Sequence, residues 1–293
     1  MFKGSNVALI TPFKDNNLDE ENYVKLINFH LENNTNGLVP AGTTGESPTL
    51  NHKEHEKVIE LCIKEANGKV PVIAGTGSNS TQEAIALTKH AEKAGADGAL
   101  VVTPYYNKPT QEGLYQHYKA INDNTSLPII IYNIPSRCVI DMSVDTMAKL
   151  FELKNIVGVK DATGDLNRLD QTIKKLGPEF IQLTGEDGLA FEFNKRGGVG
   201  IISVTANIAP KLCSDFQKYS KSKSDNEKKE AERIDQILQP LHKTLFIESN
   251  PAPVKYAAKL LGLCDDAVRL PLVKITNESQ EKVKKALSFA KLL

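Results

Sequence analysis

The chain has no excess of either charge and no long apolar run. Its 293 residues include 36 lysines and arginines and 36 aspartates and glutamates, so the formal net charge is +0. Proteins specialised for nucleic acids or membrane surfaces usually carry a basic excess, and this balance argues against both partners. The N-terminal MFKGSNVALITPF is too weakly apolar for a signal peptide, and no run reaches the ~18 apolar residues of a membrane helix. We therefore expect a cytoplasmic protein that acts on small molecules.

Cysteine is also scarce, and no C-x-x-C pair occurs. The four cysteines lie far apart in the sequence: Cys62, Cys138, Cys213 and Cys264. A disulfide framework is not indicated, and free thiols in a reducing compartment are expected. His52 and His55 are three residues apart on a predicted helix, but without a third ligand they do not predict a metal site. The chain also lacks a P-loop, G-x-S-x-G and H-E-x-x-H.

What the sequence does contain is a regular alternation of short apolar runs and segments of helical period. Leu166, Leu169 and Ile173, for example, are spaced three or four apart and form one apolar helical face. Eight runs are typical of strands: residues 6–13, 36–45, 70–78, 97–106, 127–135, 156–163, 180–187 and 198–207. Three helix starts show capping-box spacing: Asn51 with Glu54, Ser80 with Glu83, and Ser224 with Glu227.

Eight strand–helix units predict an α/β protein with a (β/α)₈ TIM barrel and a C-terminal helical extension. A doubly wound open sheet is the alternative, because periodicity does not show closure. The first strand–helix turn lacks G-x-G-x-x-G, which argues against that alternative. We expect the catalytic barrel at residues 1–222 and the helical region at residues 223–293, packed on the barrel or on another subunit.

The sixth run, IVGVKDAT (156–163), places a lysine inside a hydrophobic strand. An unpaired buried ammonium costs several kcal/mol or loses its proton. Alternation along a strand puts Ile156, Gly158 and Lys160 on one face and Val157 and Val159 on the other. If the valines face the helices, Lys160 points into the barrel mouth, and Gly158 leaves space beneath it.

Lys160 in that position has the chemistry of a Schiff-base nucleophile. Desolvation favours the neutral amine, which is the form that attacks a carbonyl carbon. The same alternation puts Tyr132 on a face with Ile130, from which its hydroxyl can move protons for a nearby amine. The alternative is structural: Lys160 pairs with Asp161 or another carboxylate, and Tyr132 is a packed aromatic with a satisfied hydroxyl.

Two further features suit carboxylate ligands. The turn GTTGES (42–47) offers the hydroxyls of Thr43 and Thr44 and several backbone N–H groups before a helix, an arrangement that favours anions. Arg137, just past the fifth run, can bind a second carboxylate in bidentate fashion. Local capping by the threonines and a surface position for the arginine are the structural alternatives.

Taken together, the motifs resemble those of one enzyme family over essentially the full length. They occur in this order: GSNVALITPF, GTTGESPTLNHKEH, GTGSNST, TPYYNKPTQEGLYQHY, IIIYNIPSR, VGVKDATGDL, LTGED and GIISVTAN. The chain is similar to the 4-hydroxy-tetrahydrodipicolinate (dihydrodipicolinate) synthases, class I aldolases of the N-acetylneuraminate lyase superfamily. The resemblance implies condensation of pyruvate with L-aspartate 4-semialdehyde on the diaminopimelate route to lysine, with no metal or organic cofactor.

The resemblance also implies catalytic roles for the matching residues. Lys160 would form the Schiff base with pyruvate, and Tyr132 would be its acid and base. Thr43 and Tyr106 would complete a hydroxyl relay with Tyr132. In the family this second tyrosine comes from a neighbouring subunit, which implies a homo-oligomer, usually a tetramer built as a dimer of dimers.

Substrate binding is implied for three more residues. Thr44 would hold the pyruvate carboxylate, the Ile202 carbonyl would line the site, and Arg137 would receive the carboxylate of the semialdehyde. The Thr-Thr turn and this arginine favour a synthase over a sister lyase that cleaves sugar acids. Cys138 departs from the threonine usual after the arginine, which bears on the local support of Arg137.

Feedback inhibition by lysine at a subunit interface is a further implication. The residues that match the effector site of lysine-sensitive synthases are Ser47, His52, His55, Asn79, Glu83 and Tyr105. A structural alternative exists here too, because Glu83 can complete a capping box with Ser80, and Asn51 can cap the helix that holds both histidines. Pro48 also departs from the small residue often found at its position.

Overall fold

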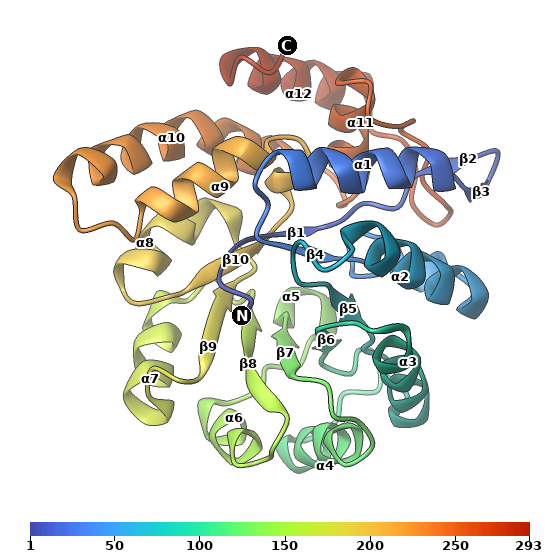
Figure 1. Cartoon of the computed structure of the whole chain (residues 1–293), viewed down its shortest axis with the longest axis vertical. Coiled ribbons are helices and arrows are strands. Elements are labelled where there is room, and N and C mark those ends of the chain that lie inside the picture. Colours follow the sequence, from blue (N-terminus) through green and yellow to red (C-terminus); the bar gives the residue numbers. More distant parts are fainter.

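The strands of the chain form a central barrel, and helices surround it (Figure 1). A computed structural model describes residues 1–293, in which one eight-stranded sheet runs in the order β4-β1-β10-β9-β8-β7-β6-β5. An isolated parallel bridge between Leu38 of β4 and Val72, just before β5, joins the two ends of this sheet. The predicted (β/α)₈ barrel is therefore confirmed, and the open-sheet alternative is wrong.

Seven of the eight predicted apolar runs contain one shorter barrel strand, whereas β1 begins two residues before the first run, at Gly4. The barrel strands are β1 (Gly4–Ala8), β4 (Gly37–Val39), β5 (Ile73–Gly75), β6 (Gly98–Val102), β7 (Ile129–Asn133), β8 (Ile156–Asp161), β9 (Ile181–Thr184) and β10 (Gly200–Ser203). A small antiparallel hairpin, β2 (Phe13–Lys14) and β3 (Asn17–Leu18), follows β1 and was not predicted. All barrel pairs are parallel, so the carboxyl ends of the strands open on one face, where such barrels carry their sites.

Helices follow the strands in turn, and none of them combines the length and the apolar character needed to span a bilayer. The barrel helices are α1 (Glu20–Glu32), α2 (His52–Ala66), α3 (Thr81–Ala94), α4 (Gln111–Asn122), α5 (Pro135–Cys138), α6 (Val144–Phe151), α7 (Leu166–Leu176), α8 (Ala190–Lys195) and α9 (Pro210–Tyr219). The tail adds α10 (Asp225–Thr244), α11 (Ala252–Leu260) and α12 (Asn277–Phe289).

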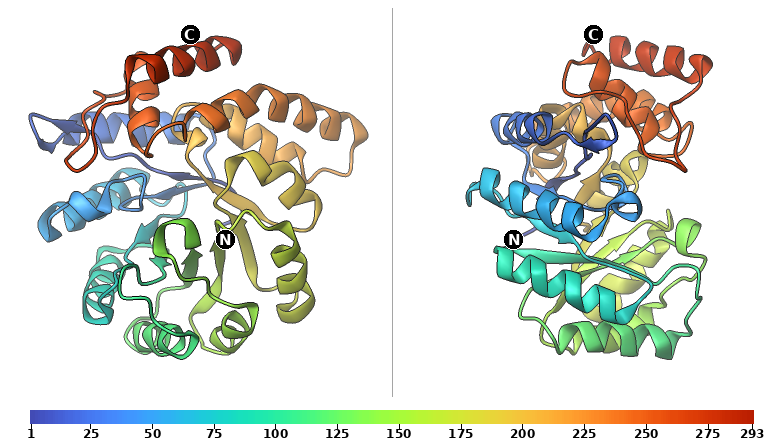
Figure 2. Two further views of the ribbon diagram at one scale, coloured as in Figure 1. Left: turned by 180° about the vertical axis from the view of Figure 1, so that it is seen from behind. Right: turned by 90° about the vertical axis from the view of Figure 1, so that its right-hand side faces the viewer.

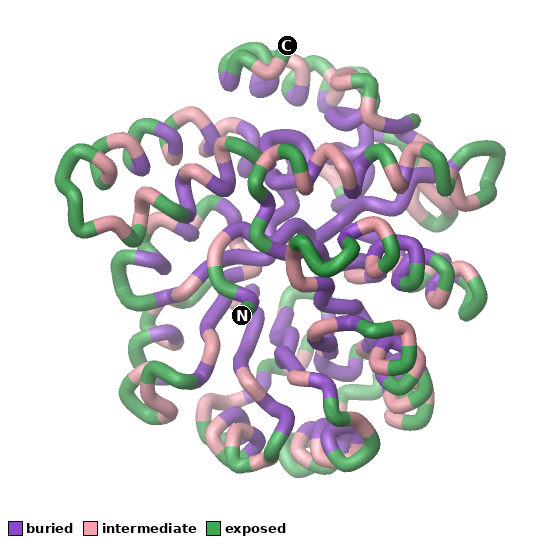
Figure 3. The backbone as a smooth tube through the Cα atoms, viewed as in Figure 1, coloured by how far each residue is buried: buried purple, intermediate pink, exposed green.

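The barrel wall separates two apolar clusters, one inside the barrel and one between the strands and the helices. On β7, Ile130 and Tyr132 belong to the inner cluster, whereas Ile129 and Ile131 belong to the outer one. This alternation agrees with the prediction for that strand. The strands are buried almost throughout, and exposed residues gather on the outward sides of the helices (Figure 3).

Strand β8 breaks the alternation near its start. Ile156 packs in the outer cluster and Val157 packs against the inner one, so the faces predicted for these two residues are wrong. The cause is an irregularity in register: Ile129 pairs with Ile156, but the next residue, Ile130, pairs with Gly158. One extra residue in β8 shifts the faces by one position, as a β-bulge does.

The C-terminal tail lies along one side of the barrel (Figures 1 and 2). Helix α10 packs beside α9, and α12 packs against α10 and α11. Leu238 and Leu241 of α10 and Leu287 of α12 belong to the same apolar cluster as the outer faces of the strands. The tail therefore packs on the barrel of its own chain.

The predicted helix starts differ in how they are capped. Asn51 and Glu54 form the full reciprocal capping box at α2. Helix α10 begins after Ser224 as expected, but the Ser224 side chain makes no capping bond. The Glu227 carboxylate instead accepts a hydrogen bond from the Ser222 hydroxyl, which removes it from the box.

Candidate active site

Lys160 and Tyr132 lie side by side inside the barrel. They are register partners on β8 and β7, and Lys160 Nζ lies 4.0 Å from the centroid of the Tyr132 ring. Only 6% of Lys160 and 5% of Tyr132 is exposed. Beyond the bulge, β8 regains its alternation, and Val159 belongs to the outer cluster. The structure thus brings the amine and the phenol together within the inner face of the wall.

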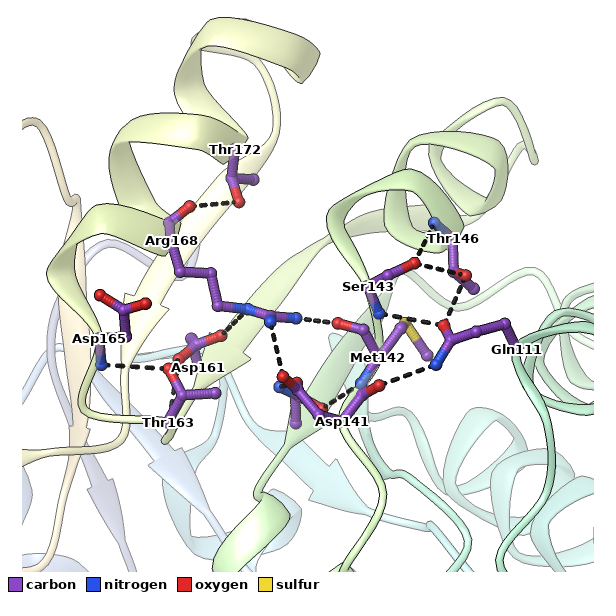
Figure 4. A network of polar contacts seen from close by, with 11 residues as sticks. Gln111, Asp141, Met142, Ser143, Thr146, Asp161, Thr163, Asp165, Arg168 and Thr172 are labelled. Carbon is purple, nitrogen blue, oxygen red and sulfur yellow. Dashed lines mark hydrogen bonds and ion pairs between the residues drawn. The ribbon is translucent and has the colours of Figure 1, made fainter.

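No carboxylate pairs with Lys160. Asp161, the partner considered in the structural alternative, forms an ion pair with Arg168, with Nε and Oδ2 2.8 Å apart (Figure 4). The backbone N–H of Thr163 donates to the other oxygen of Asp161 at 2.9 Å. The carboxylate that is adjacent in sequence is therefore occupied elsewhere, and the buried amine of Lys160 forms no ion pair.

Space for the Lys160 side chain comes from Gly185 on the turn after β9. A Cβ atom at Gly185 would lie 2.9 Å from Lys160 Cε. At Gly158 a Cβ atom would instead lie 2.2 Å from the carbonyl oxygen of Ile181, so this glycine lets β8 and β9 pack closely. The prediction that Gly158 makes room for the lysine is wrong, because its missing side chain would point at the β9 backbone.

Glu186 brings a carboxyl group within electrostatic reach of the same amine. Burial raises the pKa of Glu186, the negative charge of Asp187 raises it further, and the positive charge of Lys160 opposes the shift. Gly185 and Glu186 were not among the predicted site residues. The signal that pointed to them is the LTGED motif, in which they follow a predicted strand.

The GTTGES turn is fastened to the C-terminal tail. Thr44 is buried, and its hydroxyl accepts a hydrogen bond from Asn250 Nδ2 at 3.0 Å. Glu46 and Lys255 form an ion pair of 2.5 Å in which both side chains are completely buried. Burial lowers the pKa of Lys255, and the charge of Glu46 opposes that shift. The tail, and not local capping, engages the Thr44 hydroxyl.

Arg137 lies at the wall of a cavity of about 340 Å³ that Thr43 and Tyr132 also line. It is exposed on the short helix α5. Each of the other arginines forms an ion pair, namely Arg168, Arg196, Arg233 and Arg269. Arg137 is thus the one guanidinium of the chain without a carboxylate, and it faces a cavity.

Cys138 anchors α5, the short helix that carries Arg137. Its thiol is buried in the inner cluster and donates to the Thr103 carbonyl at the end of β6, with Sγ and O 3.3 Å apart. Burial raises the pKa of this thiol, which keeps it protonated and able to donate. The departure from threonine therefore leaves α5 with a hydrogen bond to the neighbouring strand.

Most of the predicted effector residues line the same cavity. They are Ser47, His52, His55, Glu83 and Tyr105. Burial lowers the pKa of His55 to about 4, so its ring is neutral at physiological pH. Asn79 does not line the cavity, and its carbonyl accepts a hydrogen bond from Asn107 Nδ2 at 2.8 Å.

Glu83 is only partly used as a capping residue. Its backbone N–H donates to Ser80 Oγ at 3.4 Å, but its carboxylate does not return to the Ser80 backbone. One carboxylate oxygen lies 2.9 Å from His52 Nε2, and the other accepts from the Ser78 hydroxyl. These hydrogen bonds hold the pKa of Glu83 below its usual range. A negative charge therefore lies at the cavity.

The two remaining predicted residues differ in their surroundings: Tyr106 lies on the surface, whereas Ile202 belongs to the same inner cluster as Tyr132. Tyr106 is 90% exposed and has a left-handed backbone with φ of 72°, a conformation that is uncommon for a bulky residue. Ile202 is buried in the inner cluster on β10 and pairs in register with Asn6. Within one chain the Tyr106 side chain therefore projects into solvent.

Comparison with known proteins assigns this site to a family. The profile of the dihydrodipicolinate synthetase family matches residues 1–290. A 4-hydroxy-tetrahydrodipicolinate synthase of Pelagibacter ubique is 75% identical over 293 residues, which cover 100% of both chains. The chain belongs to the dihydrodipicolinate synthetase family. The predicted membership is confirmed.

Solved structures of dihydrodipicolinate synthases share the fold over the full length. One from Acinetobacter baumannii, complexed with pyruvate, has a TM-score of 0.97 at 47% identity and is matched over 100% of both chains. One from Cyanidioschyzon merolae, with lysine bound, has a TM-score of 0.96 at 37% identity, covering 100% of this chain and 99% of that one. Membership of the dihydrodipicolinate synthetase family confirms the predicted enzyme class, a lyase of the diaminopimelate route to lysine.

Proposed function

We propose that Lys160 and Tyr132 carry out the condensation of pyruvate with L-aspartate 4-semialdehyde that gives 4-hydroxy-tetrahydrodipicolinate. The observation that carries the proposal is a buried amine without a carboxylate partner, 4.0 Å from the centroid of the Tyr132 ring. Residues 1–222 form the catalytic barrel in this proposal. Residues 223–293 form the helical region that supports it through Asn250 and Lys255.

The chemistry begins with attack of the Lys160 amine on the ketone carbon of pyruvate. Loss of water gives an iminium ion, which acts as an electron sink for removal of a methyl proton. The resulting enamine carbon attacks the aldehyde carbon of the second substrate. The amino group of that substrate then displaces Lys160 by transimination and closes the six-membered ring. The iminium supplies the electron sink, so the scheme uses no metal or organic cofactor.

Tyr132 serves as the acid and base for these proton transfers, because its ring lies against the amine. Thr43 lies at the same cavity and continues the hydroxyl relay. Tyr106 completes it from a neighbouring subunit, since in its own chain this side chain is 90% exposed. The site is therefore complete only in a homo-oligomer, which we propose to be a tetramer built as a dimer of dimers.

Thr44 and Arg137 receive the two substrate carboxylates in this proposal. Thr44, whose hydroxyl is oriented by Asn250, holds the pyruvate carboxylate with the backbone of the GTTGES turn. Ile202 lines the bottom of the site from β10 through its carbonyl. Arg137, which has no carboxylate partner in the chain, binds the carboxylate of the semialdehyde at the cavity wall.

Lysine is the proposed effector, bound where the cavity meets a neighbouring subunit in the cytoplasmic oligomer. The Glu83 carboxylate and the neutral His55 ring suit an amino acid that carries two ammonium groups. The lysine-bound relative from Cyanidioschyzon merolae supports this assignment. We take the site to consist of the five lining residues with Asn79 at its rim.

Borohydride reduction in the presence of pyruvate tests the catalytic proposal. The expected result is one pyruvate adduct, mapped by mass spectrometry to the peptide that contains Lys160. A second incubation compares turnover of pyruvate plus aspartate semialdehyde with cleavage of N-acetylneuraminate, and only the first is expected to proceed. No mass increase on that peptide would end the Schiff-base proposal.

Calorimetry with lysine tests the effector proposal separately. Lysine is expected to bind and to inhibit, and Glu83→Gln is expected to weaken binding more than tenfold, because a charged hydrogen bond is worth ~1.5–3 kcal/mol. Lys89→Gln, on the same helix and paired with Asn124, is the matched control. Absence of both heat and inhibition at saturating lysine would overturn the assignment.

A further inference from the structure

The segment Asp141–Met142 is fastened from several sides although neither residue lines the cavity. It closes the loop after β7, which carries Arg137 on α5. Asn133, the last residue of β7, is fully buried and holds both ends of this loop together. Its Nδ2 donates to Asp141 Oδ1 at 2.8 Å, and its Oδ1 accepts from the Met142 backbone N–H at 3.0 Å.

Arg168 on α7 binds the same segment and joins it to β8 (Figure 4). Its Nη1 lies 3.0 Å from Asp141 Oδ2, and its Nη2 donates to the Met142 carbonyl. Its Nε lies 2.8 Å from Asp161 Oδ2. The guanidinium is a rigid planar fork, so these three contacts fix the separation of the β7 loop and the end of β8.

Gln111, the first residue of α4, completes the attachment from the other side. Its Nε2 donates to the Asp141 carbonyl at 2.8 Å, and its Oε1 accepts from the Ser143 backbone N–H at 3.0 Å. Figure 4 shows Gln111 and Arg168 approaching the segment from opposite sides. The loop that carries Arg137 is thus held at its end by α4, β7 and α7.

The strand residues of this network directly follow the two reactive residues. Asn133 follows Tyr132, Asp161 follows Lys160, and Asn133 and Asp161 are themselves register partners. Because side chains alternate along a strand, the network lies behind the wall whose inner face carries the amine and the phenol. The side chains of Arg168 and Asp161 are only 11% and 15% exposed, so solvent screens this ion pair weakly, whereas the pair with the half-exposed Asp141 is more screened.

We propose that Arg168 is a positioning residue that sets the distance between Lys160 and Arg137, and through it the affinity for the carboxylate of the second substrate. The inference rests on the proposed role of Arg137. Arg168 is the one cation paired with either Asp161 or Asp141. Without it two carboxylates face each other unpaired, and the loop separates from β8. Pyruvate, which binds at Lys160 and the GTTGES turn, does not depend on that separation.

Steady-state kinetics and borohydride trapping with Arg168→Met test the inference. We expect KM for aspartate semialdehyde to rise about tenfold or more, whereas KM for pyruvate and the rate of trapping on Lys160 stay within about twofold. Arg168→Lys keeps the charge but loses the fork, and is expected to recover part of the affinity. Arg196→Met is the control. It removes a more exposed ion pair to Asp170, which lies on the same helix as Arg168, and it is expected to change neither KM.

Arg137→Met in the same experiment tests the proposed role of Arg137 separately from the positioning role of Arg168. If Arg137→Met raises KM for the semialdehyde and Arg168→Met does not, the positioning role is wrong and the proposed function stands. If Arg137→Met has no effect, the role of Arg137 and the inference fall together. A parallel loss of trapping and of both affinities in Arg168→Met would mean a purely structural residue. Asp141→Asn, which removes the charge from a half-exposed side chain, provides the test if Arg168→Met does not fold.

Discussion

Lys160 and Lys255 are both buried lysines that lie over an aromatic ring. Lys160 Nζ is 4.0 Å from the centroid of Tyr132, and Lys255 Nζ is 4.2 Å from that of Phe13. Lys255 is completely buried and paired with Glu46, whereas Lys160 is 6% exposed and has no carboxylate partner. Burial and the aromatic contact are common to both sites, so the anion is the difference between them.

That difference separates a structural cation from the amine that we propose as the nucleophile. A buried charge with a close partner remains an ion pair, and removing the partner is strongly destabilising. A buried amine with no carboxylate at ion-pair distance remains available to attack a carbonyl carbon, which is the role proposed for Lys160. The arginines show the same division, because Arg137 alone has no partner and lies at the cavity.

The largest expected effect is on catalysis, through Lys160→Ala. We expect synthase turnover to fall on the order of 10³-fold and the pyruvate adduct to disappear, because the nucleophile is removed. The urea midpoint of unfolding is expected to stay the same or rise, since the substitution removes an unpaired buried amine. A loss of stability as large as that of a broken ion pair would contradict the contrast between the two lysines.

Glu46→Gln is expected to have the next largest effect, on stability. It leaves the Lys255 ammonium buried without its carboxylate, and the free energy of unfolding is expected to fall by about 3–5 kcal/mol. The double variant Glu46→Gln/Lys255→Met is expected to recover much of that loss, because it removes the stranded charge. Urea titration of the three proteins gives the comparison. Equal stability of the single and double variants would show that the pair is not the source of the effect.

Gly185→Ala places a Cβ atom against Lys160 and is expected to have the smallest effect of the three. Its Cβ would lie 2.9 Å from both Ala162 Cβ and Lys160 Cε. We expect the flexible lysine side chain to yield first, and a shift of about 1 Å in the amine lowers turnover ~10²-fold. Gly188→Ala is the matched control, because its Cβ would meet only Gln239, at 3.6 Å. The rate of borohydride trapping on Lys160 measures the shift directly. Equal rates for both variants would mean that Gly185 does not set the position of the lysine.

Local sequence patterns were sufficient for the barrel and for the face of Lys160. Each of the eight apolar runs overlaps a barrel strand, and the alternation at Tyr132 and Lys160 places both toward the interior. The faces of Ile156 and Val157 were wrong, because an extra residue in a strand appears only when the neighbouring strand fixes the register. Gly158 was misread for the same reason, since the contacts of a glycine belong to the strand beside it.

Long-range partners had no signal in the sequence. Lys255 and Asn250 are polar residues near a predicted helix, and nothing local indicates that they bind the GTTGES turn. The network around Arg168 likewise joins residues from two helices, two strands and the loop after β7. Tyr106 was placed through the family resemblance and not from its own pattern. Pairings of this kind depend on the packing of the whole chain.

The attachment of the GTTGES turn to the tail joins two parts of the chain that are made at very different times during synthesis. Thr44 and Glu46 lie 206 and 209 residues before Asn250 and Lys255, so they leave the ribosome long before their partners exist. A nascent barrel must therefore carry an acidic side chain at an interior position with no cation to meet it. Contacts between residues so far apart in sequence form late, because the long loop must close first. A segment translated near the end of the chain, Asn250 and α11, thus completes the contacts of a turn translated near its beginning.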